Sequence, residues 1–239
     1  MPSSIRKALN ELPTTLDETY ERALDGIPKE KRQHAHRLFQ CLVVAIRPLR
    51  VEELAEVFAI EFEADTGPSL REGWRPESPE HAVLSACSTL IAVIEDKGSK
   101  IVQFSHFSVK EYLTSDRLRT SEMGNTRQYY TPLDVAHTIL AQACLTVLLK
   151  LDEIVDKERV KTFPLAFYAA RHWVDHAKYE DVGREFKMQW SSYLTQASLI
   201  LRHGLGYTKW ISGVQDLSKP STLSENARRG LTRLHCTMQ

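Results

Sequence analysis

The sequence has no excess of charge of either sign and no hydrophobic run long enough to cross a membrane. Lys plus Arg and Asp plus Glu both number 31 among the 239 residues, so the formal net charge is zero. Proteins that bind nucleic acids normally carry a basic excess that neutralises phosphates, so no nucleic-acid partner is expected. The most apolar runs, 42–46 and 145–149, are far shorter than the roughly 18 residues of a membrane span. We therefore expect a cytoplasmic protein with no membrane partner.

Cysteine is scarce, and the metal-binding patterns are incomplete. The four cysteines form no CxxC pair, which favours free thiols, three of them in predicted cores, over a disulfide framework. His172 and His176 have the i, i+4 spacing of two metal ligands on one helix. No third ligand lies nearby in the sequence, and the neighbouring Trp173 favours packing, so no metal site is expected.

Sequence motifs of catalysis are also missing. The chain has no Walker A loop, because Gly98-Ser99-Lys100 lacks the upstream glycine, and it has no Gly-x-Ser-x-Gly, His-Glu-x-x-His or Gly-x-Gly-x-x-Gly pattern. We therefore predict that the chain is not an enzyme, has no catalytic residue and binds no cofactor by itself.

Apolar residues at helical spacing predict three short helices in the first 60 residues, at 15–24, 29–45 and 51–58. The first begins with a capping box from Thr15 to Glu18. Its predicted buried face comprises Leu16, Tyr20, Ala23 and Leu24. The predicted solvent side of the third helix comprises Glu52, Glu53 and Glu56.

Arg47-Pro48-Leu49 predicts a rigid corner between the second and third helices. Proline is disfavoured inside a helix and restricts the residue before it to an extended conformation. Leu49 and Leu54 are then expected in the core.

A β-hairpin is predicted in the middle of the chain. Residues 61–78 contain turn residues and predict a surface loop, and Ser78-Pro79 then begins a short helix. Two β-rich runs, 90–94 and 101–104, flank a glycine-containing turn. A capping box from Ser108 to Glu111 predicts the start of the next helix, which contains Tyr112. Helices followed by a two-stranded wing and a closing helix indicate a winged-helix module.

His106 follows the second predicted strand. Alternation along this strand places His106 on the same face as Val102 and Phe104, so its side chain is expected to point inward. A buried imidazole needs a hydrogen-bond partner, which favours a structural histidine bonded to nearby backbone.

The second half of the chain predicts an all-α helical bundle. Residues 115–130 are polar and irregular, and a helix with two apolar rows follows from Thr131-Pro132. Two aromatic stripes lie further on, one ending at Trp173 and one at 186–194. The predicted fold class is mainly α, a winged-helix module with a β-hairpin followed by a helical bundle.

Several stretches resemble, in order and spacing, the region that follows the NACHT nucleotide-binding domain in fungal NLR-like STAND proteins. They are LPTTLDETYE at 12–21, RPL at 47–49 with EELA at 52–55, SHFSVKEYL at 105–113, and YAA-x-x-W-x-x-H at 168–176. The first part is also similar to the winged-helix domain of the GPI inositol-deacylase type. The residues assigned to these structural motifs are Arg47, Pro48, Leu49, Leu54, Ser108, Tyr112 and Trp173.

The resemblance implies five segments in the chain. They are the end of a NACHT-associated helical region (1–27), the winged helix (28–120), a linker (121–130), a helical bundle (131–200) and a poorly defined tail (201–239). In the tail, TRLHC at 232–236 is similar to the opening of an ankyrin repeat. The chain is therefore expected to be a fragment that lacks the NACHT ATPase.

The resemblance also implies a non-catalytic regulatory role. Its protein partners would be a NACHT domain, in the same or another chain, or other subunits. In NLR relatives a histidine at the position of His106 senses ADP, so ADP or ATP is expected to contact this chain only through a NACHT domain. The alternative is a winged-helix DNA-binding protein, but the predicted recognition helix, 79–88, contains no Lys or Arg.

Overall fold

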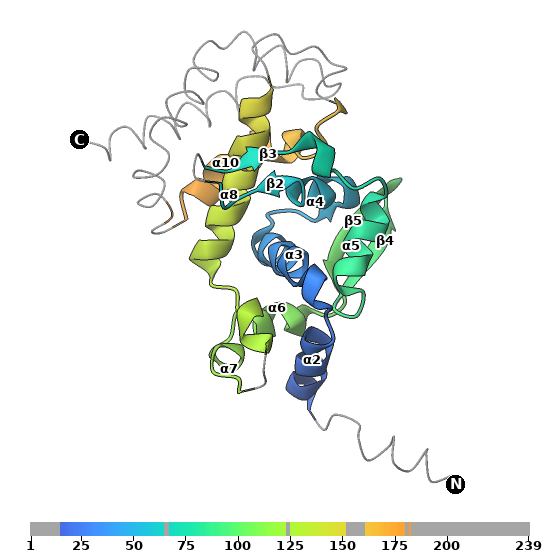
Figure 1. Ribbon diagram of the computed structural model, residues 1–239, viewed down its shortest axis with the longest axis vertical. Helices are drawn as coiled ribbons and strands as arrows, with labels where there is room; N and C mark the ends of the chain where they lie inside the picture. The colour runs from blue at the N-terminus through green and yellow to red at the C-terminus, as the bar shows by residue number, and fades with distance from the viewer. Residues whose placement is uncertain (1–14, 65–66, 123–124, 152–160, 180–181, 183–239) are drawn as a thin grey trace, which may run out of the picture.

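A computed structural model describes residues 15–64, 67–122, 125–151, 161–179 and 182 of the chain. Helices dominate these residues, and the strands form two small antiparallel sheets (Figure 1). The predicted fold class, mainly α, is confirmed. The aromatic stripe at 186–194 and the tail at 201–239 lie outside the described residues.

Helix α2 (Leu16–Asp25) begins as predicted. The Thr15 hydroxyl accepts a hydrogen bond from the Glu18 amide at 3.1 Å, and Tyr20 and Leu24 are buried. The prediction that Leu16 is buried is wrong, because its side chain is 61% exposed. Helix α2 packs against α6 (Phe107–Leu113) and the 3-10 helix η3 (Thr126–Tyr129), as the lower part of Figure 1 shows for α6, whereas Leu16 is the first residue of α2.

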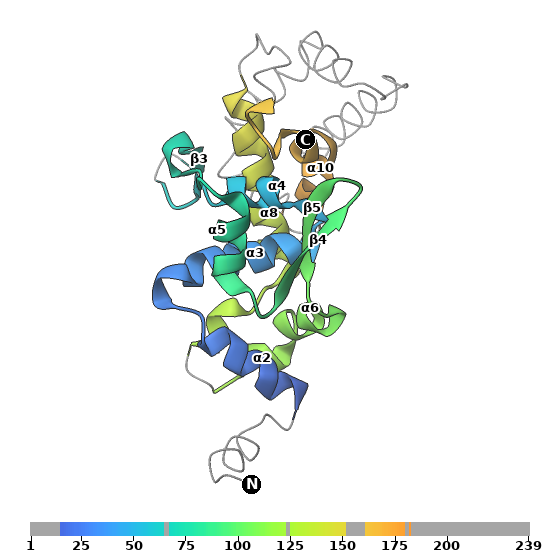
Figure 2. The ribbon, with the colours of Figure 1, turned by 90° about the vertical axis from the view of Figure 1, so that its right-hand side faces the viewer.

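The next elements form the winged-helix arrangement around α3 (Arg32–Val44). The three-stranded sheet has the order β1-β5-β4 and is antiparallel throughout. In Figure 2, α3 lies between α5 on one side and the β4–β5 hairpin on the other. These elements are η1 (Lys29–Lys31), α3, β1 (Leu49–Arg50), α4 (Val51–Val57), α5 (Pro79–Cys87), β4 (Ile91–Asp96) and β5 (Ser99–Phe104).

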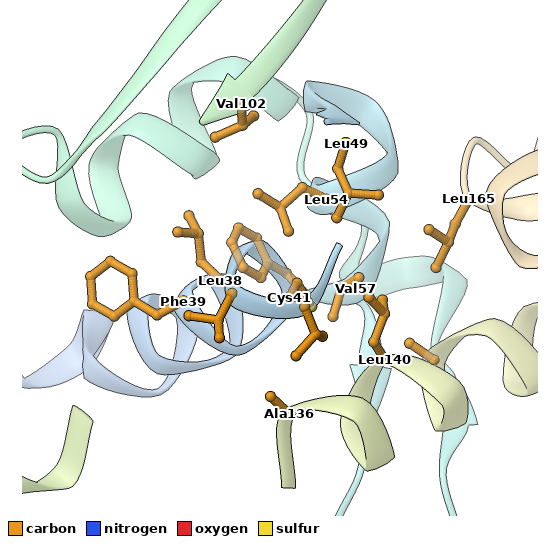
Figure 3. Close-up of a cluster of buried hydrophobic side chains, with 14 of the residues drawn as sticks. Leu38, Phe39, Cys41, Leu49, Leu54, Val57, Val102, Ala136, Leu140 and Leu165 are labelled. Atoms are coloured by element: carbon orange, nitrogen blue, oxygen red, sulfur yellow. The ribbon is translucent and has the colours of Figure 1, made fainter. Parts of the chain in front are cut away.

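The Arg47-Pro48-Leu49 corner connects α3 to α4 as predicted. Leu49 and Leu54 are fully buried, and Leu49 lies opposite Val102 in the ladder between β1 and β5. Figure 3 shows Leu49, Leu54 and Val102 on one side of α3 and Ala136 on the other. The corner therefore folds α4 back onto the core.

Replacing Leu54 with Ala should lower the free energy of unfolding by about 2 to 5 kcal/mol, because the change leaves a cavity in a packed core. Urea denaturation measures this loss. The matched control is Leu16→Ala, which should change stability by less than about 0.5 kcal/mol because Leu16 is exposed. Equal midpoints for the two variants would remove Leu54 from the core.

The prediction that residues 61–78 form only a loop is wrong in part. This segment and the residue before it carry a short ladder between β2 (Ile60–Glu61) and β3 (Ser69–Leu70), followed by the 3-10 helix η2 (Glu72–Trp74). Strands of two residues are too short for a detectable alternation of polar and apolar residues. By contrast, the β4–β5 hairpin is confirmed, and its turn residues Lys97 and Gly98 both have positive φ angles, 50° and 77°.

Two glutamates of α4 are buried, although all three were predicted to face solvent. Both Glu53 carboxylate oxygens accept hydrogen bonds from the Arg47 guanidinium, at 2.7 and 2.8 Å, and Arg50 adds its backbone amide and two guanidinium nitrogens as donors. Glu56 accepts from Arg75 at 2.6 Å and from the Leu165 amide at 2.7 Å. These donors satisfy the buried charges, as a buried carboxylate requires.

The two carboxylates respond differently to this environment. Burial by itself raises the pKa of Glu53, but the hydrogen bonds and positive charges of Arg47 and Arg50 outweigh it, so the pKa lies below the ordinary value. For Glu56 burial raises the pKa by more than the hydrogen bond from the Leu165 amide and the charge of Arg75 lower it, so its pKa lies above the ordinary value. The surroundings of Glu53 therefore favour its charged form, whereas the burial of Glu56 opposes its charged form.

The second helical part packs directly on the winged helix. Helix α8 (Leu133–Lys150) lies against α3, and α10 (Ala166–Ala177) lies against α8 (Figure 1). The predicted stripe is confirmed, because Leu165, Tyr168, Ala169 and Trp173 are all buried. One continuous hydrophobic cluster includes residues from α2 through α10.

The described part of the predicted linker is packed rather than extended into solvent. Helix α7 (Asp116–Arg119), just before the linker, buries Leu118. Within the linker, η3 buries Tyr129, whose ring lies edge-on to that of Phe39 of α3, with 5.8 Å between the ring centroids. The winged helix and the helices after the linker share one hydrophobic core. The boundaries of the five predicted segments stay a prediction.

Helix α8 carries both predicted apolar rows, with Ile139, Ala143 and Val147 buried in one and Leu140 and Cys144 in the other. With 18 residues and a mean hydropathy of 1.4 it is also long and apolar enough, by length and composition alone, to cross a membrane. The sequence analysis counted only uninterrupted apolar runs, and so it did not detect that this whole helix is apolar on average. Within the fold 56% of the helix is buried, and its apolar rows meet α3 and α10.

Candidate functional site

His106 caps α6 and is exposed, so the prediction of an inward side chain is wrong. Strand β5 ends at Phe104, which is its last residue paired with β4. The alternation of faces therefore does not continue to His106, whose extended backbone leads into α6. His106 is therefore not a buried histidine of the core.

The predicted capping box at Ser108 is also wrong, because the N-cap of the helix lies two residues earlier. His106 is the N-cap residue, and its Nδ1 accepts a hydrogen bond from the Ser108 amide at 3.3 Å. The side chain of His106 thus does what a serine or aspartate commonly does at this position. Tyr112 lies in the same helix, as predicted, and its side chain is buried.

A chain of three hydrogen-bonding side chains ends at this histidine. The Tyr20 hydroxyl lies 2.6 Å from Ser108 Oγ, and Ser108 Oγ lies 2.5 Å from His106 Nδ1. Because the Ser108 amide can only donate, Nδ1 must be the accepting nitrogen, and the ring hydrogen lies on Nε2 in the neutral histidine. Because His106 is exposed, this N–H donor lies at the surface of the fold.

An aromatic side chain stands beside this donor. Phe107 is 71% exposed, and its ring centroid lies 4.4 Å from that of His106. Large exposed aromatics next to a polar donor are typical of contact surfaces for another molecule. We call His106, Ser108, Phe107 and Tyr20 the α6 site; it lies where α6 meets α2 (Figures 1 and 2).

A second polar cluster lies between α8 and α10 and was not predicted. His137 Nδ1 is 2.9 Å from Nδ1 of the buried His176, whose Nε2 is 2.9 Å from the Tyr168 hydroxyl. The Tyr168 hydroxyl also accepts from the Ile46 amide at 3.1 Å. No local spacing could reveal this cluster, because His137 and His176 are 39 residues apart.

The second cluster is uncharged at neutral pH. Burial, together with a smaller contribution from the nearby His137 and His172, lowers the pKa of His176 to about 3. His172 Nδ1 lies 3.5 Å from Asp175 Oδ2. Within the described ranges, no group of three or more His, Cys, Asp and Glu residues could hold a metal ion.

The described cysteines do not form a reactive site. Cys41, Cys87 and Cys144 are free and buried, as predicted for three of the four. Burial raises the pKa of the Cys41 thiol to about 12 and raises that of Cys144 as well. Thiols with raised pKa values are poor nucleophiles at neutral pH.

Comparison with known proteins identifies the first part of the chain. Residues 20–124 match the family model described as "GPI inositol-deacylase, winged helix domain". This part of the chain is a winged helix domain. Its matched region includes every residue of the α6 site. No solved structure matches the chain significantly.

One curated relative extends beyond the winged helix. The chain is 35% identical over 176 residues to "Azaphilone pigments biosynthesis cluster protein L" from Monascus ruber, and the match covers 70% of this chain. The match covers 36% of that relative, so the chain spans about a third of the relative's length.

Proposed function

We propose that the chain is a non-catalytic regulatory module of an NLR-like STAND signalling protein and acts on a NACHT nucleotide-binding domain in the same or another chain. The observation that carries this proposal is the outward N–H of His106 beside the exposed Phe107. A fixed donor next to an aromatic ring suits a partner that offers an oxygen acceptor, such as a nucleotide phosphate.

The rest of the molecule supports a regulatory role over catalysis. The described cysteines are buried thiols with raised pKa values, and the histidines between α8 and α10 satisfy one another. The resemblance to the segment after a NACHT domain supplies the partner. Localisation in the cytoplasm and contact with ADP or ATP only through the partner domain are parts of the same proposal.

The sensing role of His106 is tested in a full-length relative that carries a complete nucleotide-binding domain. Replacing the equivalent histidine with Ala should reduce the amount of ADP that copurifies by about tenfold, the effect of losing one charge-assisted hydrogen bond. The measurement is nucleotide content by chromatography after denaturation. An unchanged ADP content would contradict the proposal.

Two controls separate sensing from folding. His106→Asn in the isolated chain keeps a side chain that caps α6, so its unfolding temperature should stay near that of the original chain, whereas His106→Ala should lose about 1 kcal/mol. In the full-length relative both variants should lose ADP.

Calorimetry of the isolated chain should detect no micromolar binding of ATP or ADP, because the chain lacks a Walker A loop.

A further inference from the structure

We propose that a pocket formed by η1, α3, η2 and α5 is a docking site for a short segment of a partner protein that carries an arginine and an acidic residue. The pocket is lined by Glu30, Lys31, His34, Phe58, Trp74 and Pro76, among others, and we call it the Trp74 pocket. It shares no residue with the α6 site, so the inference does not depend on the proposed function.

The size and opening of the Trp74 pocket suit a short stretch of peptide. Its volume is about 560 Å³, within the range of sites that hold a ligand. The pocket is open to solvent at Trp74, whose side chain is 57% exposed. In Figure 2, β3 and α5 lie on the left-hand side of the molecule, together with the blue segment that leads into α3. An open pocket of this kind accommodates an extended segment that passes through it, with one or two side chains inserted.

Aromatic rings form part of the lining. The His34 ring stacks on the Phe58 ring, with 4.8 Å between the ring centroids. Burial, together with the charge of Lys31, lowers the pKa of His34, so this ring is uncharged at neutral pH. The Trp74 side chain makes no hydrogen bond and no ring contact with any other residue that the structure describes. Its indole ring is therefore available to a partner's arginine, since arginine stacks favourably on tryptophan.

Charges of opposite sign flank two parts of the lining. The segment 72–80, which includes Trp74, has three acidic residues and one base, Arg75, whose guanidinium is bound by the buried Glu56 at 2.6 Å. The segment 29–32, which supplies another part of the lining, has three bases and one acidic residue. A partner segment with both charges therefore matches the pocket better than a segment of one sign. Its arginine would lie toward Trp74 and its carboxylate toward the bases of 29–32.

The test is a selection of short random peptides, displayed on phage, against the full chain, followed by calorimetry with the synthetic consensus peptide. The selected peptides should share an arginine and an acidic residue. Replacing the arginine of the consensus peptide with citrulline, which is similar in shape but uncharged, should weaken binding about tenfold. The inference is overturned if no peptide is enriched, or if the enriched peptides are purely apolar or otherwise lack arginine.

Variants of the chain show whether the peptide occupies the Trp74 pocket. Trp74→Ala should weaken binding of the consensus peptide about tenfold, with little change in the unfolding temperature because the side chain is exposed. The matched control is Phe107→Ala, which removes an exposed aromatic ring outside the pocket and should leave binding unchanged. Glu77→Lys should also weaken binding; unlike Glu80, which pairs with Lys100, Glu77 forms no ion pair within the described part of the chain. Unchanged binding in Trp74→Ala, or an equal loss in Phe107→Ala, would place the peptide elsewhere and overturn the inference.

Discussion

Replacing Glu53 with Ala is expected to lower the free energy of unfolding by about 3 kcal/mol, as measured by urea denaturation. The change removes a fully buried carboxylate and leaves Arg47 and Arg50 without their shared partner. The side chains of Arg47 and Arg50 are 34% and 39% exposed, so water can solvate their charges in the variant and offset part of the loss. The expected effect therefore lies at the lower end of the range for breaking a buried ion pair.

Glu52 provides the matched control on the same helix. It is the neighbouring residue, of the same type, but it is exposed, so Glu52→Ala should change stability by less than about 0.5 kcal/mol. Equal losses for the two variants would mean that helix propensity, and not the buried ion pair, determines the effect. Denaturation should be followed both by circular dichroism and by tryptophan fluorescence, because Glu53 lies in α4 next to the core residue Leu54. If the two signals give different transitions, unfolding passes through an intermediate.

Acid should destabilise the fold progressively as the pH falls from about 6.5 to about 3. Burial lowers the pKa of His176 to about 3, and burial together with the charge of Arg37 lowers that of His36 to about 4, with partial compensation by the Tyr130 backbone. A histidine whose pKa is lowered by folding adds stability above its unfolded pKa, near 6.5, and this stability is lost as the pH falls. At pH 5 the loss is about 2 kcal/mol for each histidine, or about 4 kcal/mol together.

Denaturation at a series of pH values tests this expectation. Near pH 5 the slope of stability against pH should correspond to the uptake of about two protons by these histidines on unfolding. In His176→Gln that number should fall by about one. A slope that is the same in the original chain and in His176→Gln would show that His176 is not buried in its neutral form.

Local patterns predicted much of the fold. The Thr15 cap, the Arg47-Pro48-Leu49 corner and the turn at Gly98 depend on residues close in sequence, and all three have the expected structure. Their success follows from short-range sterics and hydrogen bonding, which a stretch of a few residues contains in full.

The predictions that were wrong depended on partners distant in sequence. Glu56 was assigned to solvent because a helical pattern treats every carboxylate as exposed, whereas its donor at Leu165 is 109 residues away. His106 was assigned to the interior because alternation was extended beyond the last paired residue of β5.

The packing of α8 on α3 bears on how such a protein can be rearranged by evolution. Figure 3 shows α3 covered on one side by Leu49 and Leu54 and on the other by Ala136 and Leu140 of α8. A recombination event that joined a foreign sequence after residue 130 would strip one side of α3 unless the new sequence brought a complementary apolar surface. The winged helix and α8 should therefore be inherited together, and diversity among relatives should accumulate beyond them rather than between them.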